Sequence, residues 1–245
     1  MTANSTARGG HADRVFRAEG FTKGFGRTDV LKSASLWATA GRVSVLFGRN
    51  GSGKSTLLRC MLGLAVAETG VTHFGGLASE RPKLRRLARR GLFYLPDRAF
   101  LPRTLRFGTA VGAVEAAHGP CPNREQIFER LGVGTWADRR PSELSGGEQR
   151  RCEWALALLS QPSCIVADEP LAGVTPKDQV LVCAVVREAA SRGCAVIVTG
   201  HEVEQLLNLG DEIVWMTSGT THGLGAPANA LKHEQFRREY LGPRA

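Results

Sequence analysis

The sequence has no long apolar run. Its best apolar stretch, Val180–Val186, falls far short of the roughly 18 residues that a membrane-spanning helix needs. The N-terminal residues MTANSTARGGHADR include no apolar segment like that of a secretory signal. We therefore expect neither a membrane anchor nor a signal peptide in this sequence.

Cysteine pairs with metal-binding spacing are also missing. The cysteines form no CxxC pair, so the sequence offers no zinc-finger-like site. They lie mostly within apolar or helical stretches, which favours buried, reduced thiols and a reducing cytoplasm. These residues are Cys60, Cys121, Cys152, Cys164, Cys183 and Cys194.

Acidic residues are in the minority. The 245-residue chain has 23 aspartates and glutamates against 32 lysines and arginines, a net charge of +9. This excess suits nucleic acid, an anionic membrane surface or a phosphate-rich ligand, without distinguishing among them. The hydrophobic fraction of 42% is that of an ordinary globular protein, and the length corresponds to one large domain or two small ones.

What the sequence contains is an alternation of apolar strands with helices. Strands are predicted over Arg42–Phe47, Ser163–Ala167, Ala195–Thr199 and Glu212–Met216. Helices are predicted over Lys54–Leu64, Glu148–Leu159, Asp178–Ser191 and Val203–Leu209. This alternation is typical of a parallel sheet with crossover helices, so the predicted fold class is α/β.

The remaining segments differ from that alternation. Residues 1–14 are rich in Gly, Ser, Thr and Ala and are predicted to be a disordered tail. Residues 15–47 contain short strand-like segments separated by glycines. Glu80–Arg90 predicts a strongly basic helix. From about residue 98, a mixture of glycine, proline and helical stretches indicates an inserted helical region.

A phosphate-binding loop is predicted after the strand Arg42–Phe47. Gly48–Ser55 matches GxxxxGK[ST] in the strand–loop–helix context that this pattern requires. Its glycines let the backbone direct N–H groups at phosphate oxygens, and the helix N-terminus adds a partial positive charge. Lys54 is expected to reach the β- and γ-phosphates, and the Ser55 hydroxyl to bind Mg²⁺. The predicted nucleotide-binding residues of this segment are Gly48, Arg49, Asn50, Gly51, Ser52, Gly53, Lys54, Ser55 and Thr56.

Two carboxylates follow a second predicted strand. Asp168 and Glu169 stand directly after the mostly apolar residues Cys164–Ala167, at the carboxyl end of the strand. Ligands of parallel α/β sheets bind at this edge. Asp168 is therefore predicted to hold the hydration shell of Mg²⁺, and Glu169 to orient or deprotonate the attacking water. The loop Gly48–Ser55 could alternatively be a glycine-rich turn with a solvated lysine. The presence of this second motif argues against that alternative.

A third motif opens the helix Glu148–Leu159. Ser145 and Glu148 have the spacing of a capping box, in which each side chain bonds the backbone N–H of the other residue. Around them, Leu144–Arg151 reads LSGGEQRR, which resembles the signature of ATP-binding cassette (ABC) ATPases. The alternative, a capped helix with no further role, is disfavoured beside a phosphate loop and an Asp–Glu strand.

The resemblance covers residues 15–243 and implies further roles. In ABC ATPases two copies enclose two ATP molecules, and each signature helix directs its N-terminus at the γ-phosphate held by the opposite copy. Phe25 stands where an aromatic residue stacks on adenine, and His201 where a switch histidine contacts the γ-phosphate. The nucleotide contacts implied for the signature are Ser145, Gly146 and Gly147.

Two positions depart from the family pattern. The family usually has glutamine in place of Asp97, where the side-chain oxygen meets Mg²⁺ and the attacking water, so Asp97 is predicted as an altered metal-site residue. It usually has aspartate in place of Thr175, in the loop that couples the two sites across the dimer. These changes bear on catalytic rate and coupling rather than on nucleotide binding. Glu169, His201 and the complete signature argue for an active enzyme.

The resemblance also implies a fold and a domain organisation. It predicts a P-loop NTPase (RecA-like) core with an antiparallel β subdomain and an inserted α-helical subdomain at about residues 98–147. Residues 15–245 would then form a single ABC ATPase domain. Three short segments are similar to segments of the cassettes that serve lipopolysaccharide export and branched-chain amino-acid import. They read RRGLFYLPD, DEPLAGVTP and FRREYLG. The implied cofactors are ATP and Mg²⁺.

The function implied is that of an ATPase subunit powering a transporter. Two copies, or one copy and a second ABC ATPase, would close around ATP and drive separate transmembrane subunits, with the chain peripheral on the cytoplasmic face of the membrane. A soluble ABC ATPase acting on nucleic acid would suit the net charge. However, translation-associated members resemble two cassettes in one chain, and repair members carry coiled coils or zinc sites.

Other functions have less support in the sequence. A regulatory module with little turnover is supported by the departures at Asp97 and Thr175 alone. A GTPase is excluded because no NKxD or TKxD base-recognition run occurs, and a monomeric kinase would have no use for LSGGEQ. We therefore expect a transporter ATPase that does not bind nucleic acid.

Overall fold

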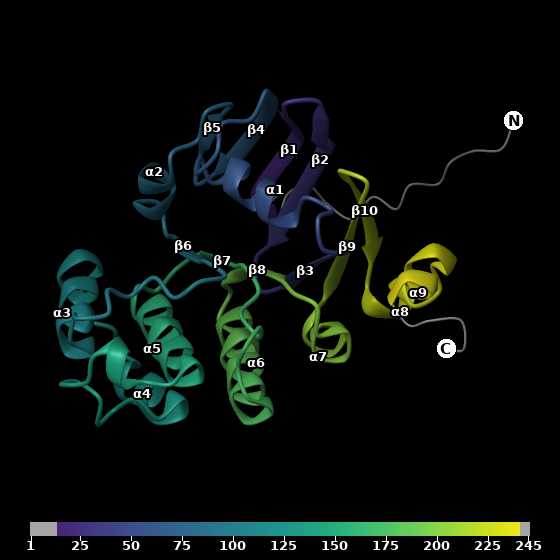
Figure 1. Ribbon diagram of the computed structural model, residues 1–245. Coiled ribbons are helices and arrows are strands. Elements are labelled where there is room, and N and C mark those ends of the chain that lie inside the picture. The colour runs from purple at the N-terminus through teal and green to yellow at the C-terminus, as the bar shows by residue number, and fades with distance from the viewer. Residues whose placement is uncertain (1–13, 241–245) are drawn as a thin grey trace, which may run out of the picture.

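The computed structural model describes residues 14–240, which form two sheets with helices between and around them (Figure 1). The larger sheet has six strands in the order β10 (Thr220–Gly225), β9 (Glu212–Thr217), β3 (Val43–Gly48), β8 (Ala195–Thr199), β7 (Cys164–Ala167) and β6 (Leu92–Leu95). The smaller sheet has four strands in the order β2 (Thr28–Thr39), β1 (Arg14–Phe25), β4 (Thr69–Phe74) and β5 (Leu77–Ser79).

The helices alternate with the strands of the larger sheet along the chain. They are α1 (Lys54–Met61), α2 (Leu84–Ala88), α3 (Phe107–His118), α4 (Arg124–Leu131), α5 (Gly146–Leu159), α6 (Pro176–Ser191), α7 (Val203–Leu209), α8 (Pro227–Ala230) and α9 (Glu234–Tyr240). A 3₁₀ turn, η2 (Pro141–Glu143), precedes α5. The segment from α3 to η2 lies within the inserted helical region expected at about residues 98–147.

Strand pairing separates the two sheets by type. In the larger sheet β9, β3, β8, β7 and β6 pair in parallel, and β10 adds an antiparallel edge. The strands of the smaller sheet pair only in antiparallel fashion. Every residue of β3, β7 and β8 is buried, as expected for parallel strands covered on both faces.

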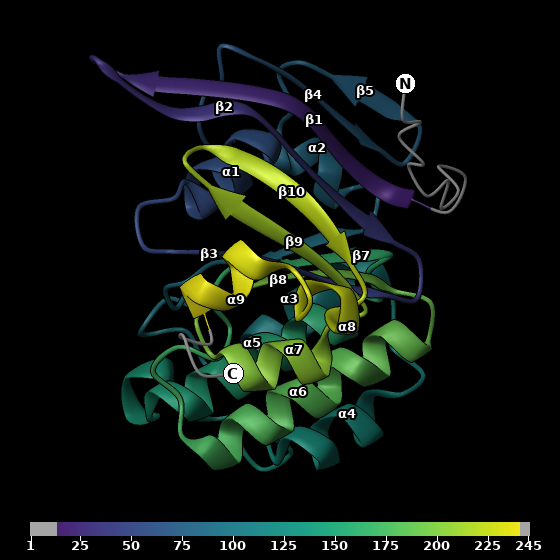
Figure 2. The ribbon, with the colours of Figure 1, turned by 90° about the vertical axis from the view of Figure 1, so that its right-hand side faces the viewer.

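Helices cover both faces of the larger sheet. On one face, Leu57 and Leu58 of α1 pack with Leu46 of β3 and with Phe21 of β1, so that α1 lies between the two sheets. On the other face, Val45 joins a core formed with α5 and α6 (Figure 2). α3 and α4 pack beside α5 at one end of the molecule, which builds the inserted region onto the sheet (Figure 1).

This architecture confirms the predicted fold class, an α/β core with an additional antiparallel sheet and inserted helices. The predicted tail, residues 1–14, lies outside the described residues except for Arg14, which begins β1. The cysteines are free thiols, and all but Cys183 are buried, in agreement with the prediction. Within residues 14–240, no helix is both long enough and apolar enough to cross a bilayer.

Some helices are shorter or longer than predicted, for local reasons. The helix expected over Lys54–Leu64 ends at Met61, because Gly63 adopts a φ of +74°. The basic helix expected over Glu80–Arg90 is reduced to α2, since Lys83 is extended and Pro82 is buried. α6 starts two residues early, because the Thr175 side chain caps it.

Candidate active site

The phosphate-binding loop leaves the larger sheet at the end of β3 and enters α1. Gly53, the N-cap of α1, has a φ of +107°, and a Cβ there would lie 2.9 Å from Met216 Cε and 3.0 Å from the Val30 carbonyl oxygen. Gly51 has a φ of +80°. A side chain at Gly48 would collide with Ser52. The loop therefore needs glycine at these positions, both for its conformation and for its packing.

Lys54, the first residue of α1, is buried against the start of this loop. Its Nζ donates a hydrogen bond of 2.6 Å to the carbonyl oxygen of Gly48. Burial lowers the pKa of Lys54, and the charges of Glu169 and Asp168 oppose that effect. An ammonium group has three protons, so the bond to Gly48 leaves capacity to bind an anion.

Asp168 lies at the carboxyl end of β7 and is 2% exposed. Thr199 Oγ1 donates a hydrogen bond of 2.6 Å to Asp168 Oδ1. Burial raises the pKa of this carboxyl, the hydrogen bonds from Thr199 and Ser55 lower it, and the nearby charges of Asp97 and Glu169 raise it. Asp168 and Ser55 therefore lie side by side, as the sequence predicts for a shared metal ion.

Glu169, the next residue after Asp168, has an unusual backbone conformation. Its φ of +49° lies in the left-handed region, which a residue with a side chain rarely adopts. Its N–H donates a hydrogen bond of 2.9 Å to Thr199 Oγ1. Its Oε1 lies 3.0 Å from Nε2 of His201, so the two predicted catalytic side chains are in direct contact. Both remain partly exposed, Glu169 at 26% and His201 at 39%.

A cavity of about 400 Å³ joins several of the predicted residues. Phe25, at the end of β1, stands at its edge with 57% of its surface exposed. Such an exposed ring can stack on a nucleobase while the loop binds phosphates. The lining consists of Phe25, Val30, Arg49, Asn50, Gly51, Gly53, Lys54, Ser55, Thr56 and Glu169.

The signature residues lie elsewhere, at the start of α5. Ser145 caps the helix: its N–H donates to Glu148 Oε2 at 2.8 Å, and the Glu148 N–H donates to its hydroxyl at 3.3 Å. Hydrogen bonds from Ser145 lower the pKa of Glu148. A Cβ on Gly147 would collide with the Asp178 carboxylate. Ser145, Gly146 and Gly147 do not line the cavity of the phosphate loop.

The two departing positions have distinct environments. Asp97 is exposed after β6, and its carbonyl oxygen accepts a hydrogen bond of 3.0 Å from Arg150 Nη2. Thr175 caps α6, since its hydroxyl accepts the Asp178 N–H at 3.3 Å and donates to Asp178 Oδ2 at 2.8 Å. An aspartate at position 175 could accept the same N–H, because Asp and Thr are both good N-cap residues.

The chemistry of these residues fits a magnesium nucleotide. The Ser52 hydroxyl is buried and has no hydrogen-bond partner within residues 14–240, as expected where a ligand supplies one. Proteins bind Mg²⁺ through one or two carboxylates, water and substrate phosphates. Ser55 and Asp168 are the oxygen ligands available.

No sequence pattern marks Thr199, Arg150 or Glu153 as part of the site. Thr199 is found only from the strand register that the structure supplies: β7 and β8 are parallel with Ala167 opposite Val198, so the residues that follow these two lie side by side. Arg150 and Glu153 form a buried pair on α5, which requires knowledge of the tertiary fold.

Comparisons with known proteins agree on one family. The model of the family "ABC transporter" matches residues 31–172. A probable ABC transporter ATP-binding protein of Azorhizobium caulinodans is 35% identical, with 94% of this chain and 84% of that protein covered. The lipopolysaccharide export system ATP-binding protein LptB of Haemophilus influenzae is 28% identical, with 93% and 97% covered. The ADP conformation of MJ1267, an ATP-binding cassette of an ABC transporter, superposes with a TM-score of 0.79 at 25% identity, covering 94% of this chain and 99% of that chain.

Proposed function

The chain belongs to the ABC transporter family and is an ATPase of that type, and from this premise we propose that it dimerises around ATP to power separate membrane-spanning subunits. The observation that carries the proposal is the composition of the cavity. A phosphate loop, an exposed aromatic ring and a carboxylate in contact with a histidine surround one space of about 400 Å³. The signature residues, by contrast, stand outside it.

Within one site, we assign the following roles. Lys54 and the N–H groups of Gly51–Lys54 bind the β- and γ-phosphates at the start of α1. Phe25 stacks on the base. Glu169 accepts a proton from the attacking water, whose oxygen bonds to the γ-phosphorus as the bond to the leaving ADP breaks. His201 holds the Glu169 carboxylate in place through the 3.0 Å contact.

Mg²⁺ would be held by Ser55 and Asp168, with Asp97 nearby. When bound, the ion supplies positive charge that offsets the charge of the phosphate oxygens. Asp168 is deeply buried and keeps its carboxylate beside the Ser55 hydroxyl, so these two side chains offer oxygen ligands of the kind that Mg²⁺ prefers.

We propose that a second copy, or a second ABC ATPase subunit, completes each site. Ser145 and Gly146 are exposed at the N-terminus of α5, where unpaired N–H groups and the helix dipole favour an anion. They do not line the cavity of their own chain. A partner related by two-fold symmetry would present this helix end to the nucleotide.

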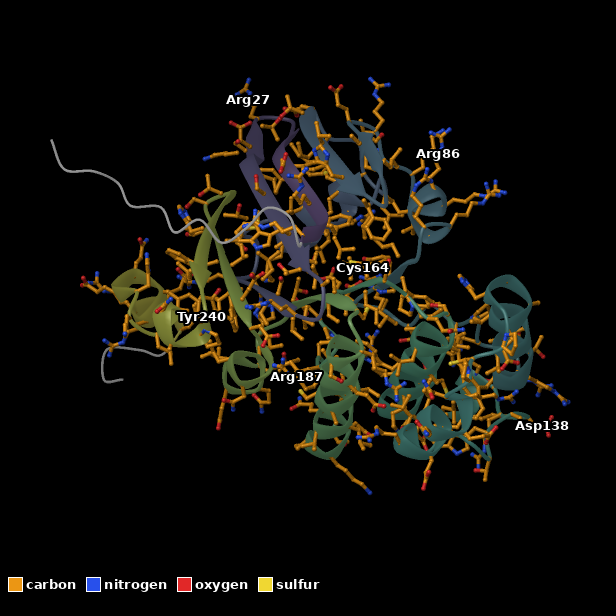
Figure 3. The ribbon with its side chains drawn as sticks, turned by 180° about the vertical axis from the view of Figure 1, so that it is seen from behind. Arg27, Arg86, Asp138, Cys164, Arg187 and Tyr240 are labelled. Atoms are coloured by element: carbon orange, nitrogen blue, oxygen red, sulfur yellow. The ribbon has the colours of Figure 1, made fainter. Side chains whose placement is uncertain are left out.

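We further propose that the chain is cytoplasmic and peripheral on the inner face of the cell membrane, bound to its transmembrane subunits. α2 and its flanks expose a set of cations, and Arg86 projects outward from α2 (Figure 3). Within the described residues none of these cations forms an ion pair, so they are available to anionic headgroups or acidic loops of a partner. They are Arg81, Lys83, Arg85, Arg86, Arg89 and Arg90.

The experiment that tests this function is trapping of the dimer. We expect Glu169→Gln to elute as a dimer in gel filtration with ATP and Mg²⁺ and as a monomer without ATP. The amide keeps the shape of the side chain but cannot accept the proton of the attacking water, so ATP persists between the two copies.

The matched control is Glu169→Gln combined with Lys54→Ala, which should stay monomeric because it cannot hold the phosphates. If Glu169→Gln alone stays monomeric with ATP and hydrolyses ATP at the wild-type rate, the role given to Glu169 is contradicted. Wild-type protein that binds MgATP but shows no measurable hydrolysis would favour the alternative, a regulatory module with little turnover.

A further inference from the structure

Thr199 occupies the point where two strands of the larger sheet end together. It is the last residue of β8 and is fully buried. β7 pairs with β8 in parallel, with Ala167 opposite Val198, so Thr199 comes to lie beside the Asp168–Glu169 pair. Its position therefore follows from strand register. A shift of one residue in the pairing of β7 with β8 would move the Thr199 side chain away from this pair.

The Thr199 hydroxyl makes two hydrogen bonds whose directions are fixed. The Glu169 N–H can only donate, so the hydroxyl accepts that bond, which is 2.9 Å long. The hydroxyl proton is then free to be donated to Asp168 Oδ1, at 2.6 Å. One buried hydroxyl thus joins the side chain of one proposed active-site carboxylate to the backbone of the next.

Both bonds act on groups whose orientation matters. The donation to Oδ1 fixes the rotation of the Asp168 carboxylate beside Ser55. The bond to the Glu169 N–H anchors a residue whose φ of +49° is unfavourable for a residue with a side chain. Anchored in this way, Glu169 reaches His201.

We propose that Thr199 is a positioning residue that sets the metal-binding carboxylate Asp168 and the proposed base Glu169 in one geometry. The inference rests on the proposed function, since it takes the roles of those two residues from it. Thr199 itself contacts neither water nor phosphate in this role. It acts through the two residues that do.

The test compares Thr199→Val, which keeps the branched shape but lacks the hydroxyl, with Thr199→Ser, which keeps the hydroxyl. We expect Thr199→Val to lower kcat for ATP hydrolysis by at least about tenfold, as expected when a hydrogen bond to a charged group is lost. KM for ATP should change much less, because the phosphate loop is untouched. Thr199→Ser should retain most of the turnover.

A second readout does not depend on hydrolysis. The affinity for ADP is measured by calorimetry with Mg²⁺ and with EDTA. The ratio of the two affinities gives the metal-dependent gain, which is the increase in ADP affinity that Mg²⁺ causes. Thr199→Val should lose most of that gain and keep the affinity in EDTA, whereas Thr199→Ser should resemble wild type. Since ADP needs no turnover, this comparison stands even if the wild-type chain proves a slow ATPase.

Thr72→Val is the matched control for the loss of a buried hydroxyl. Thr72 is also fully buried, and its hydroxyl donates to the Met61 carbonyl oxygen at 2.8 Å, away from the proposed site. Its removal should leave kcat and the metal-dependent gain unchanged. The proposal is overturned if Thr199→Val keeps both the turnover and the metal-dependent gain, or if Thr199→Ser is impaired as severely as Thr199→Val.

Discussion

Asp97 places a carboxylate where the resemblance described above implies an amide. Its backbone is fixed, because Arg150 binds its carbonyl oxygen, while its side chain is exposed. Its charge is close enough to Asp168 to raise the pKa of that buried carboxyl, in addition to the larger effect of burial. An ionised Asp97 also cannot donate a hydrogen bond to the attacking water, which an amide can do.

We therefore predict that Asp97→Gln increases the turnover number. Removal of one negative charge beside Asp168 and the γ-phosphate, together with a longer side chain that can donate, should position the water better. The expected increase is about two- to tenfold, well below the range of a complete general acid–base contribution. Steady-state hydrolysis at matched ATP and Mg²⁺ concentrations measures it, ideally with the membrane partner present.

Asp97→Asn is the control that separates charge from length. If charge dominates, Asn and Gln should raise turnover alike; if reach dominates, only Gln should do so. A Gln variant as slow as wild type, or slower, would mean that the aspartate suits this site. The same result would arise if the loop after β6 aligned differently with the family pattern.

Most of the proposed site could be predicted residue by residue, because its chemistry is carried by short contiguous motifs. The loop Gly48–Ser55 and the pair Asp168–Glu169 each follow a strand, and the fold brings them to one edge of the sheet. Thr199 could not be found in this way, since a threonine at the end of an apolar strand has no distinguishing pattern. Its role depends on the register between two strands far apart in sequence.

Among the helices and strands, α5 is bonded to the loop that follows β6. Arg150 and Glu153 form a buried ion pair of 2.9 Å on α5. Arg150 also donates to the carbonyl oxygens of Pro96 and Asp97, each at 3.0 Å, and Glu153 accepts the Phe100 N–H at 2.8 Å. The helix that begins with the signature is thus bonded directly to the loop that carries Asp97.

We predict that Glu153→Ala destabilises the fold by about 3–5 kcal/mol, because it leaves the Arg150 charge buried without a partner. Urea unfolding followed by circular dichroism measures this free energy. The matched control is Glu234→Ala, which removes an exposed i,i+4 pair with Arg238 on α9. That change should cost less than about 0.5 kcal/mol. Equal effects of the two substitutions would contradict a structural role for the buried pair.

The prediction of elements from the sequence was most accurate for the parallel sheet. β8 and α7 have the predicted bounds, since apolar strands and a 3.6-residue period leave little ambiguity. The sequence predicts no strand at β10 and no helices at α8 and α9, because these short elements depend on tertiary packing. Phe236 of α9, for example, is buried against Phe47 of β3. The division into a tail and one ATPase domain stays a prediction.

In the whole molecule, the signature lies apart from the cavity of the phosphate loop. The helix end formed by Ser145 and Gly146 is exposed and does not line the cavity of its own chain. A helix N-terminus attracts phosphate only within about its first turn, so it must face a nucleotide directly to act. If each site combines the phosphate loop of one copy with the signature of the other, damage to the two motifs should complement between chains.

Gly146→Asp is suited to damage the signature without unfolding it. A Cβ at this position meets only the Gly173 carbonyl oxygen, at 3.9 Å. An acidic residue in the first turn also stabilises a helix, while its charge repels the phosphates. Gly147 is less suitable, because a side chain there would collide with Asp178. Lys54→Ala damages the other half of the site.

We predict that Lys54→Ala and Gly146→Asp are each inactive alone and regain ATP hydrolysis when mixed. In a mixed dimer one site carries both substitutions and the other carries neither. If pairing is random, equal mixing makes half of the dimers mixed, and about a quarter of the wild-type rate should return when the two sites of a two-fold dimer act independently. If the damaged copies do not pair with themselves, the mixed dimers predominate and the recovered rate rises toward about half. As a control, Lys54→Ala mixed with the double variant Lys54→Ala/Gly146→Asp should regain nothing, because both phosphate loops are then damaged.

Absence of recovery in the first mixture, with dimers verified by gel filtration, would mean either that each site is built within one chain or that both sites must be intact to turn over. Mixing Lys54→Ala with wild type separates these two explanations: only the second requires the mixed dimers, which have one intact site, to be inactive.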